Sequence, residues 1–369
     1  MRRNARDKRT EPEGQRGCCL SRFSRVAPLF GPPAGFAFLL FLGWLEPGLA
    51  QVLDLALPFF GLIGLGFVAG RLVGHSEGGL AWMNAFIVYV ALPALFFNLV
   101  SRTPIAELAN GSFVAVTMTG TACAFALSFT TGLAVTLGDL AVSAMQGIAG
   151  AYSNIGYMGP GLTLAALGPT SAAPTALIFV GDTVLLFSLL PFLMALAHQE
   201  GGGWVRTAGL VIWRIVTHPF NLATAAGILA AALNWQAPVA VGRLLTLLQG
   251  AAAPCALFGM GVMVALRPMR AITPELPVLL FIKLILHPLI VWMLLSIIGG
   301  FDRVWVFTAV LMAALPPALN VFIMASSYQT YVERASNLIL IGTLVSVITV
   351  TGLLYLVTSG LVPADLLHR

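Results

Sequence analysis

The chain has 369 residues, of which 59% are hydrophobic and only 9% are charged. Soluble domains are about one-quarter charged, so this composition excludes an ordinary soluble enzyme or binding module and indicates an integral membrane protein. The net charge of +5 does not indicate nucleic-acid binding, because eight of the 19 Lys and Arg residues precede residue 26 and the others are scattered singly.

Residues 1–51 form an N-terminal extension that differs from the rest of the chain. A long basic segment is followed by a short apolar stretch and by small residues before Gln51. This order is typical of a signal peptide. The alternative is an over-extended reading frame whose true start is Val52, with a non-ATG codon, because no Met lies between Met1 and Met83. The length of the basic segment favours the second interpretation.

From Val52 onward, long apolar runs alternate with short polar or Gly/Pro breaks. Runs of about 20 residues without polar alternation predict membrane-spanning helices and exclude a barrel of strands. The predicted spans are 52–71, 80–100, 112–137, 141–168, 174–197, 218–235, 243–266, 276–298, 304–328 and 336–360. The expected fold class is therefore all-α integral membrane, with about ten transmembrane helices.

The longest interruption, residues 198–217, leaves five predicted spans on each side. It carries Arg206 and Arg214 among apolar residues, a pattern typical of a helix in the membrane interface. We expect a first five-helix repeat at 52–197, a linker at 198–217 and a second five-helix repeat at 218–369. A weak excess of Arg after the odd-numbered spans predicts a cytoplasmic linker, with both ends of the chain outside.

The two halves carry prolines, glycines and aromatic residues at one constant offset. The pairs, each 161 residues apart, are Pro58 and Pro219, Phe59 and Phe220, Gly66 and Gly227, Pro93 and Pro254, and Phe97 and Phe258. Repeated matches at one offset favour an internal duplication. An odd number of spans in each copy forces the second copy to insert upside down, which predicts two inverted five-helix repeats.

Spans four and nine contain helix-breaking sequences, a Gly-Pro-Gly and a Pro-Pro. Broken helices at corresponding places in two repeats are typical of a substrate site, because their free N–H groups and dipoles attract an anion. The alternative is a pair of proline kinks with an Asn bridging two helices; the paired breaks favour a site. The candidate substrate-binding residues are Asn154, Gly159, Pro160, Pro316, Pro317 and Asn320.

Three ionisable residues lie deep inside predicted spans: Asp182, Lys283 and His287. Such groups are costly in hydrocarbon and usually pair or act. Asp182 and Lys283 are expected to pair, either as a structural lock or as a site that couples transport to a cation or offsets a substrate charge. His287 precedes Pro288, so we expect it to bond backbone groups that the proline leaves free.

No sequence feature predicts a metal, a cofactor or an enzyme. The four cysteines, Cys18, Cys19, Cys123 and Cys255, fit neither a zinc site nor a disulfide framework. His-Glu-x-x-His does not occur in the sequence, and Gly-x-Ser-x-Gly is absent from the predicted spans.

Five segments from Val52 onward resemble those of the auxin efflux carrier family, which includes bacterial relatives of plant PIN-formed carriers and malonate and malate permeases. They are Leu57 to Gly66, Leu92 to Asn98, Ser153 to Pro160, Lys283 to Pro288, and Leu315 to Tyr328 with Glu333-Arg334-Ala335. The resemblance covers residues 52–360 and is most specific in the ninth span. The extension before Val52 departs from the family pattern.

The resemblance implies ten helices in two inverted repeats, with broken spans four and nine crossing at their prolines. It also implies a scaffold of spans one, two, six and seven, an elevator-like or rocking mechanism, and a plasma-membrane permease for small organic anions such as mono- or dicarboxylates. Proton or sodium coupling and a homodimer are left open. The alternatives are a cation-coupled symporter or antiporter of the sodium/bile-acid type and a membrane receptor that does not transport.

Overall fold

A computed structural model describes residues 47–73, 81–197, 209, 212–213, 216–217, 219–266 and 273–367. The chain divides into two compact units, 1–50 and 51–369, and the second unit carries nearly all of the described residues. The predictions for the N-terminal extension and for the linker at 198–217 lie, for the most part, outside the described residues.

The second unit is built of helices. Their bounds are α2 (Pro47–Val73), α3 (Ala81–Phe86), η4 (Ile87–Ala91), α4 (Leu92–Ser101), α5 (Ile105–Leu108), α6 (Gly111–Val135), α7 (Leu140–Ala151), α8 (Gly159–Leu167), η5 (Pro169–Ser171), α9 (Ala172–Ala197), α11 (Pro219–Ala232), α12 (Val239–Leu266), α13 (Glu275–Phe281), η6 (Ile282–Leu286), α14 (His287–Ile298), α15 (Arg303–Ala314), α16 (Leu319–Ser327) and α17 (Val332–Thr358).

Seven helical segments of the described chain are long and apolar enough to cross a membrane, and three more apolar helices are shorter. The seven are Asp54–Val73, Ala81–Ser101, Ile105–Val135, Pro169–Ala197, Val239–Leu266, Glu275–Ile298 and Val332–Thr358; the shorter ones are Leu140–Ala151, Pro219–Ala232 and Arg303–Ala314. Each overlaps one of the predicted spans. The prediction of an all-helical integral membrane protein is confirmed.

Polar caps start several of these helices. Asn110 accepts a hydrogen bond from the backbone N–H of Phe113 at the start of α6. The short helices α7 and α15 have the same length, 12 residues, and each begins after an aspartate, Asp139 or Asp302, whose carboxylate accepts a backbone N–H. Such caps satisfy N–H groups that have no partner inside the helix.

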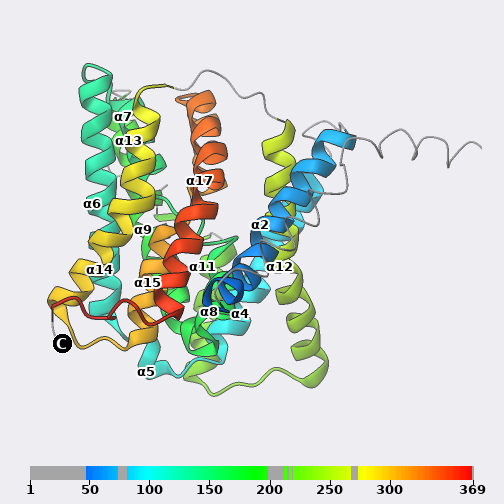
Figure 1. Cartoon of the computed structure of the whole chain (residues 1–369). Coiled ribbons are helices and arrows are strands. Elements are labelled where there is room, and N and C mark those ends of the chain that lie inside the picture. The colour runs from blue at the N-terminus through cyan, green and yellow to red at the C-terminus, as the bar shows by residue number, and fades with distance from the viewer. Residues whose placement is uncertain are drawn as a thin grey trace, which may run out of the picture. The chain divides into compact units, whose positions relative to one another are not determined.

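The helices form two groups. In Figure 1, α6, α13 and α14 of one group lie on one side of the unit and α2 and α12 of the other lie on the opposite side, with α4 and α11 between them. One group, here called the four-helix bundle, contains α2, α3–α4, α11 and α12, and α4 packs against both α11 and α12. The other, here called the crossing bundle, contains α6 to α9 and α13 to α17; α6 packs against α7, α9 and α14, and α14 packs against α15. Helices α4 and α9 contact one another between the two groups.

Glycines bring the backbones of the four-helix bundle into close contact. A Cβ added to Gly66 of α2 would lie 2.1 Å from the carbonyl oxygen of Phe258 in α12. A Cβ added to Gly227 of α11 would lie 2.9 Å from the Val100 side chain and 3.2 Å from the Phe97 carbonyl oxygen in α4. Small residues allow this approach, which is the usual way to pack helices tightly in a bilayer.

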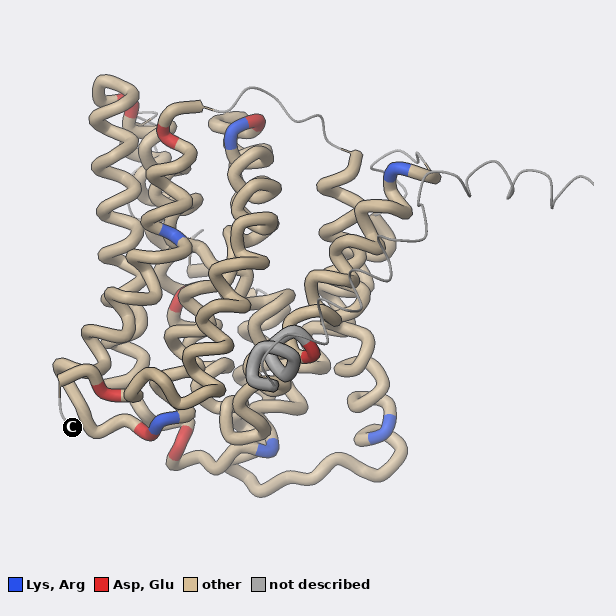
Figure 2. Tube along the Cα trace, in the orientation of Figure 1, with Lys and Arg blue, Asp and Glu red and all other residues tan. Residues whose placement is uncertain are grey.

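Charged residues gather at the helix ends, and few lie along the middle of the helices (Figure 2). At one end of the crossing bundle, Arg334 of α17 donates to the carboxylate of Glu275 in α13 at 2.9 Å. The Arg334 guanidinium also lies 5.8 Å from the ring centre of Tyr331. This cluster joins the ends of α13 and α17, where a charge costs less than it does in the bilayer interior.

Two π-helical turns each lead directly into a proline. The turn η4 precedes Leu92-Pro93, and η6 precedes His287-Pro288. Proline has no N–H and its ring clashes with the carbonyl of the preceding turn, so a local widening of the helix accommodates it. As a result, the second turn places Lys283 and His287 on a distorted stretch of helix.

Candidate functional site

The fourth predicted span is broken, but not at its Gly-Pro-Gly. Helix α7 ends at Ala151, and Tyr152 has an extended backbone with φ −75° and ψ 103°. The non-α stretch covers residues 152–158, and Pro160 lies in the first turn of α8. The predicted position of the break was therefore wrong. A proline is well accommodated at the start of a helix, where its missing N–H has no intrahelical partner to lose.

The ninth predicted span is broken where its prolines predicted. Helix α15 ends at Ala314, and Leu315 is extended with ψ 150°. Pro316 and Pro317 lie in the gap, and α16 begins at Leu319. Consecutive prolines cannot continue a helix because neither can donate to the preceding turn.

The two gaps lie side by side and pair through their backbones. The Asn154 N–H donates to the Pro316 carbonyl at 2.8 Å, and the Ala318 N–H donates to the Tyr152 carbonyl at 3.0 Å. Between them, Ser153 and Pro317 form an antiparallel bridge. This short pairing, here called the crossing, satisfies backbone groups that the two broken helices would otherwise leave unbonded within the membrane.

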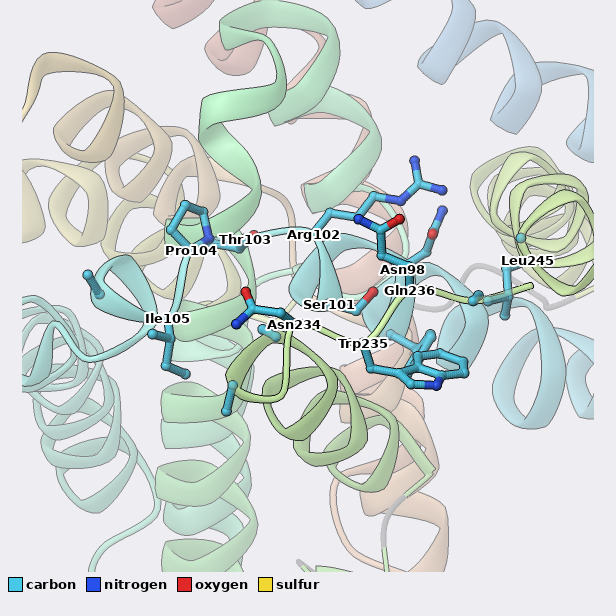
Figure 3. A pocket seen from close by; sticks show the side chains of 16 residues that line it. Asn98, Ser101, Arg102, Thr103, Pro104, Ile105, Asn234, Trp235, Gln236 and Leu245 are labelled. Carbon is cyan, nitrogen blue, oxygen red and sulfur yellow. The ribbon is translucent and has the colours of Figure 1, made fainter. Parts of the chain in front are cut away.

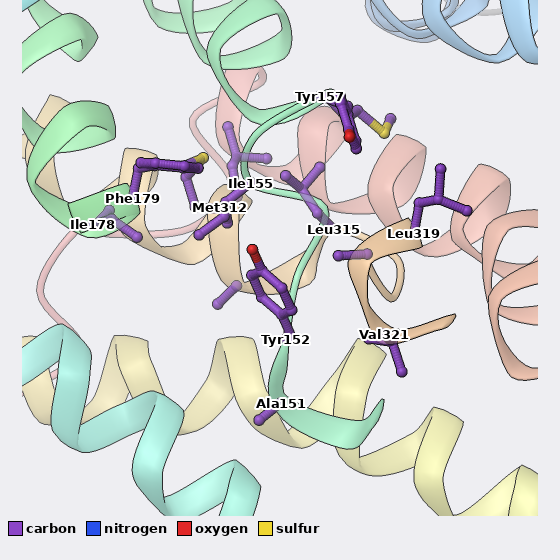
Figure 4. Packing of buried hydrophobic residues seen from close by; sticks show 14 of the residues in the cluster. Ala151, Tyr152, Ile155, Tyr157, Ile178, Phe179, Met312, Leu315, Leu319 and Val321 are labelled. Atoms are coloured by element: carbon purple, nitrogen blue, oxygen red, sulfur yellow. The ribbon is translucent and has the colours of Figure 1, made fainter. Parts of the chain in front are cut away.

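Side chains reinforce the crossing. The Ser153 hydroxyl donates to the Ala313 carbonyl at 3.2 Å, and the Asn320 amide donates to the Tyr152 hydroxyl at 3.1 Å. Figure 4 shows Tyr152 and Ile155 in the stretch between α7 and α8, with Met312 of α15 and Leu315, which follows α15, beside them. The crossing thus holds a few polar groups within a buried apolar shell.

Asn154 is fully buried and poorly satisfied. Its side-chain nitrogen lies 3.5 Å from the Met260 sulfur, and its side-chain oxygen has no hydrogen-bond partner among the described residues. A thioether is a weak acceptor, so this amide retains most of its capacity to bond. Leaving a buried polar group unpaired costs about 1–3 kcal/mol, which makes Asn154 a candidate for ligand contact.

The second halves of both broken helices begin at the crossing. Neither α8 nor α16 has a side-chain cap at its N-terminus. The Asn154 carbonyl accepts from the N–H groups of Met158 and Gly159, so α8 is capped in part by backbone. The N-terminus of α16 therefore presents the freer set of N–H groups, in a position that favours a negatively charged group.

Gly159 is placed by packing. A Cβ at this position would lie 2.6 Å from the Met312 sulfur, so a larger residue would require the Met312 side chain to move. Gly159 and Pro160 are both buried at the beginning of α8. Of the predicted site residues, Asn154, Pro316, Pro317 and Asn320 come together at the crossing, whereas Gly159 and Pro160 support it from the adjoining helix.

Asp182 and Lys283 lie beside the crossing without pairing directly: the structure gives no ion pair between these two described side chains. Two other side chains join them. Thr121 lies 2.8 Å from an Asp182 oxygen and 3.3 Å from the His287 Nε2, and the Lys283 ammonium lies 3.3 Å from the His287 Nδ1. The ammonium also donates to the Ala313 carbonyl at 2.6 Å. The expectations of a direct ion pair and of a His287 bonded only to backbone were therefore wrong.

A larger pocket lies elsewhere, between the end of α4, α5, and the loop from α11 to α12. It has a volume of about 780 Å³ and carries polar side chains including Asn98, Arg102, Asn234 and Gln236 (Figure 3). A large pocket with convergent polar groups is an ordinary candidate for a binding site. However, no residue of the crossing lines it. We therefore regard the crossing as the better candidate, because its geometry is specific to broken membrane helices.

Two contributors to the crossing, Tyr152 and Ser153, were not predicted. Thr121, which lies outside the crossing and bonds Asp182, was not predicted either. A signal for Thr121 existed, because the third span reads Thr117-Met-Thr-Gly-Thr121 and so carries repeated hydroxyls in an apolar helix. Tyr152 and Ser153 directly precede Asn154, and they could have been included once the break was placed before Gly159.

Comparisons with known proteins agree with this picture. The sequence profile of a family described as "Membrane transport protein" matches residues 52–354. A protein of Rhizobium meliloti (strain 1021) named "Putative malonate transporter" is 50% identical over 321 residues, which cover 86% of this chain and 99% of that relative. An "Uncharacterized transporter" of Methanothermobacter thermautotrophicus is 24% identical over 296 residues, which cover 78% of this chain and 92% of that protein.

These matches extend across both broken helices and most of the spans on either side of them. They agree with the resemblance to the auxin efflux carrier family, which is most specific in the ninth predicted span. The chain is a multi-pass protein of the bacterial inner membrane. It belongs to the membrane transport protein family, the auxin-efflux-carrier-like family that its motifs resemble.

Proposed function

We propose that this protein is a secondary transporter of small organic anions, with short dicarboxylates of the malonate kind as its principal substrates. Its 50% identity to a relative named as a malonate transporter supports this substrate class. The observation that carries the proposal is the crossing, where two broken membrane helices meet and leave a buried amide and a helix N-terminus without a side-chain cap. Both features suit a carboxylate.

The proposed architecture is two inverted five-helix repeats, at 52–197 and 218–369. The glycine contacts support it: Gly66 lies against Phe258, and Gly227 lies against Phe97. Gly227 lies 161 residues after Gly66, and Phe97 lies 161 residues before Phe258. The glycine therefore comes from the first half in one contact and from the second half in the other. A two-fold axis between the repeats produces this reciprocal pattern. The equal lengths and aspartate caps of α7 and α15 agree with it.

The proposed substrate contacts are the Asn154 and Asn320 amides and the N-terminus of α16. Asn154 reaches Met260 of α12, so the site lies where the crossing bundle meets the four-helix bundle. Pro316 and Pro317 keep the backbone open, and Gly159 and Pro160 allow α8 to begin against α15. A relative movement of the two bundles would expose such a site to each side of the membrane in turn.

Asp182 and Lys283 are proposed to tune the charge of this site. The Lys283 ammonium and the Ser153 hydroxyl bond the same Ala313 carbonyl, so the positive charge lies one residue from the end of α15. An ammonium beside the crossing lowers the cost of bringing an anion into the bilayer. Asp182 balances this charge when no anion is bound.

Two alternatives lead to different outcomes. A cation-coupled carrier of the sodium/bile-acid type would require sodium for transport. A receptor would bind an acid without moving it. The test is uptake and exchange of labelled malonate and a panel of organic acids by the purified protein in liposomes, with and without proton or sodium gradients. Binding without movement of any acid would favour the receptor.

The site itself is tested by Asn320→Ala, which removes the amide that bonds the Tyr152 hydroxyl. We expect malonate transport to fall by at least about tenfold while the melting temperature changes little, since one part-buried hydrogen bond contributes about 1 kcal/mol. Asn84→Ala is the matched control, because the Asn84 amide is half-buried and lies 4.0 Å from a methionine sulfur, that of Met263. Full activity in Asn320→Ala would remove Asn320 from the site.

A further inference from the structure

A continuous chain of polar side chains runs from the crossing into the crossing bundle. It begins at the Ala313 carbonyl and continues through Lys283, His287 and Thr121 to Asp182. These side chains come from four elements (η6, α14, α6 and α9), and all four are buried. A polar path of this length inside a membrane protein is costly unless it has a function.

The chemistry of the four groups gives the path one direction. A lysine ammonium can only donate, so the Nδ1 of His287 accepts from Lys283 and the neutral ring carries its proton on Nε2. This proton assignment follows from the network. The Nε2–H then donates to the Thr121 oxygen, and the Thr121 hydroxyl donates to the Asp182 carboxylate. From Lys283 to Asp182, each of these donors points toward Asp182, while the ammonium also donates to the Ala313 carbonyl.

The surroundings offer few competing groups. A small cavity of about 10 Å³ beside Asp182 is lined by residues of α6, α9, α14 and α15, and among these only Asp182 and His287 can titrate. The other lining residues are Thr117, Thr121, Ile178, Val291, Ala309 and Ala313. Lys283 approaches from η6, and Tyr152, which directly follows α7, has its hydroxyl bonded to Asn320.

We propose that Lys283, His287, Thr121 and Asp182 form a proton relay, through which the carrier moves one proton together with each organic anion. The proposal rests on the proposed function of the crossing as an anion site. It names the proton as the coupled ion, and it gives His287 and Thr121 a role as positioning residues that connect the two charged groups.

One shift along the relay balances without any further reactant. The Lys283 ammonium gives a proton to the Nδ1 of His287, the Nε2 proton passes to the Thr121 oxygen, and the Thr121 hydroxyl proton passes to Asp182. One N–H bond breaks at lysine and one O–H bond forms at the carboxyl group. The imidazole changes tautomer, the hydroxyl is restored, and the net charge is unchanged.

The relay becomes a coupling device when a proton arrives from solvent. With Lys283 charged and Asp182 protonated, the group carries one positive charge beside the crossing. That charge attracts an anion, and the anion in turn stabilises the added proton, so the two bind reciprocally. Release of the anion on the other side of the membrane removes this support and releases the proton.

The spacing argues against a simple structural lock. A lock needs its two charges in direct contact, because the attraction then offsets the cost of burying both. Here Asp182 and Lys283 are separated by a histidine and a threonine, the two side chains that can each donate and accept at once. This arrangement weakens a lock and suits the passage of a proton.

The test is malonate uptake by the protein in liposomes, driven by a proton gradient, together with malonate/malonate exchange at equal pH. Thr121→Val keeps the shape of the side chain and removes the hydroxyl. We expect gradient-driven accumulation to fall by at least about tenfold, while exchange at saturating malonate stays within about twofold. Thr121→Ser restores the hydroxyl and should restore accumulation.

Thr117→Val is the matched control. Thr117 lies one helical turn from Thr121 and lines the same small cavity, but its hydroxyl bonds only carbonyls of its own helix. We expect it to keep both activities. A second readout is the proton taken up when malonate binds in weakly buffered detergent solution, expected at about one per malonate for the unaltered protein and near zero for Thr121→Val.

The outcomes separate the relay from the proposed function. If the unaltered protein exchanges malonate but ignores the proton gradient, or if Thr121→Val accumulates malonate normally, the relay is overturned and the carrier remains. If no organic acid moves under any condition, the proposed function fails and the relay fails with it. If the Thr121→Val protein does not fold, proton uptake is compared instead between the unaltered protein and His287→Gln. The glutamine side chain can form hydrogen bonds but cannot pass a proton.

Discussion

The crossing and the glycine contacts of the four-helix bundle are built on opposite principles. At Gly66 and Gly227, backbones touch directly and no room is left even for a methyl group. At the crossing, two helices stop, pair over three residues and leave the Asn154 amide with a single weak contact. The first region is closely packed, whereas the second retains hydrogen-bonding groups that have no strong partner within the protein.

The difference shows how stability and transport are distributed in this molecule. Close packing of small residues stabilises the association of helices in a bilayer. Contact between apolar side chains adds little there, because lipid tails are equally apolar. Unsatisfied polar groups lower stability, and they persist where a ligand uses them. The four-helix bundle should therefore tolerate little added volume, and the crossing should tolerate loss of a polar group without loss of fold.

The largest expected effect is on stability, at Gly66. Gly66→Ala places a Cβ against the Phe258 carbonyl oxygen, so α2 and α12 must separate; we expect a loss of about 3 kcal/mol, read as a clear fall in melting temperature in detergent. Gly64→Ala is the control, because nothing lies within 4 Å of an added Cβ there. Equal melting temperatures for both variants would refute the close contact.

Lys283→Met should reduce both stability and transport. The substitution takes a donor from the Ala313 carbonyl and leaves Asp182 without a balancing charge; we expect a loss of about 2 kcal/mol and no measurable malonate uptake. The double variant with Asp182→Asn should recover most of the stability and none of the transport. A double variant no more stable than Lys283→Met would show that the two charges do not balance one another.

Asn154→Leu should separate function from stability. The amide has no partner but a thioether, so its replacement by an apolar side chain of similar size should change stability by less than about 1 kcal/mol. Malonate uptake should fall by at least about tenfold. Asn84→Leu, beside the Met263 sulfur, is the matched control and should transport normally. A stable and fully active Asn154→Leu would exclude the amide from the site.

The smallest effect is expected in the pocket at the end of α4. Arg102 is exposed and lines a cavity that no residue of the crossing reaches. Arg102→Gln should therefore change the half-saturating malonate concentration by no more than about twofold. The small change would come from the loss of one positive charge that attracts anions to the surface. A tenfold increase would instead identify this pocket as a place where the anion binds on its path.

Much of the helical layout could be predicted, because it follows from composition and spacing. Apolar runs of membrane length located the spans, and Pro316-Pro317 located the break in the ninth. The break in the fourth span was misplaced, because Pro160 can either interrupt a helix or start one. Only the pairing of residues 152–154 with 316–318 decides between these roles, and that pairing joins segments far apart in the sequence.

The chain of polar side chains from Lys283 to Asp182 could not be predicted from the sequence either. Asp182, Lys283 and His287 stood out as ionisable residues in apolar spans, but their order in space depends on how four elements pack. The hydroxyl of a threonine within a helix ordinarily donates to a carbonyl of the same helix, as the Thr117 hydroxyl does. Nothing in the local sequence distinguishes the two threonines, and only the tertiary fold brings one of them to Asp182.

The joint between the broken helices is made by peptide groups, with the side chains of Ser153 and Asn320 added to it. Peptide groups are common to nearly all residue types, so the mechanical connection survives changes in the side chains around it. Carriers descended from one ancestor can therefore alter which solute they recognise while inheriting the same joint. Diversity of cargo then requires no new architecture.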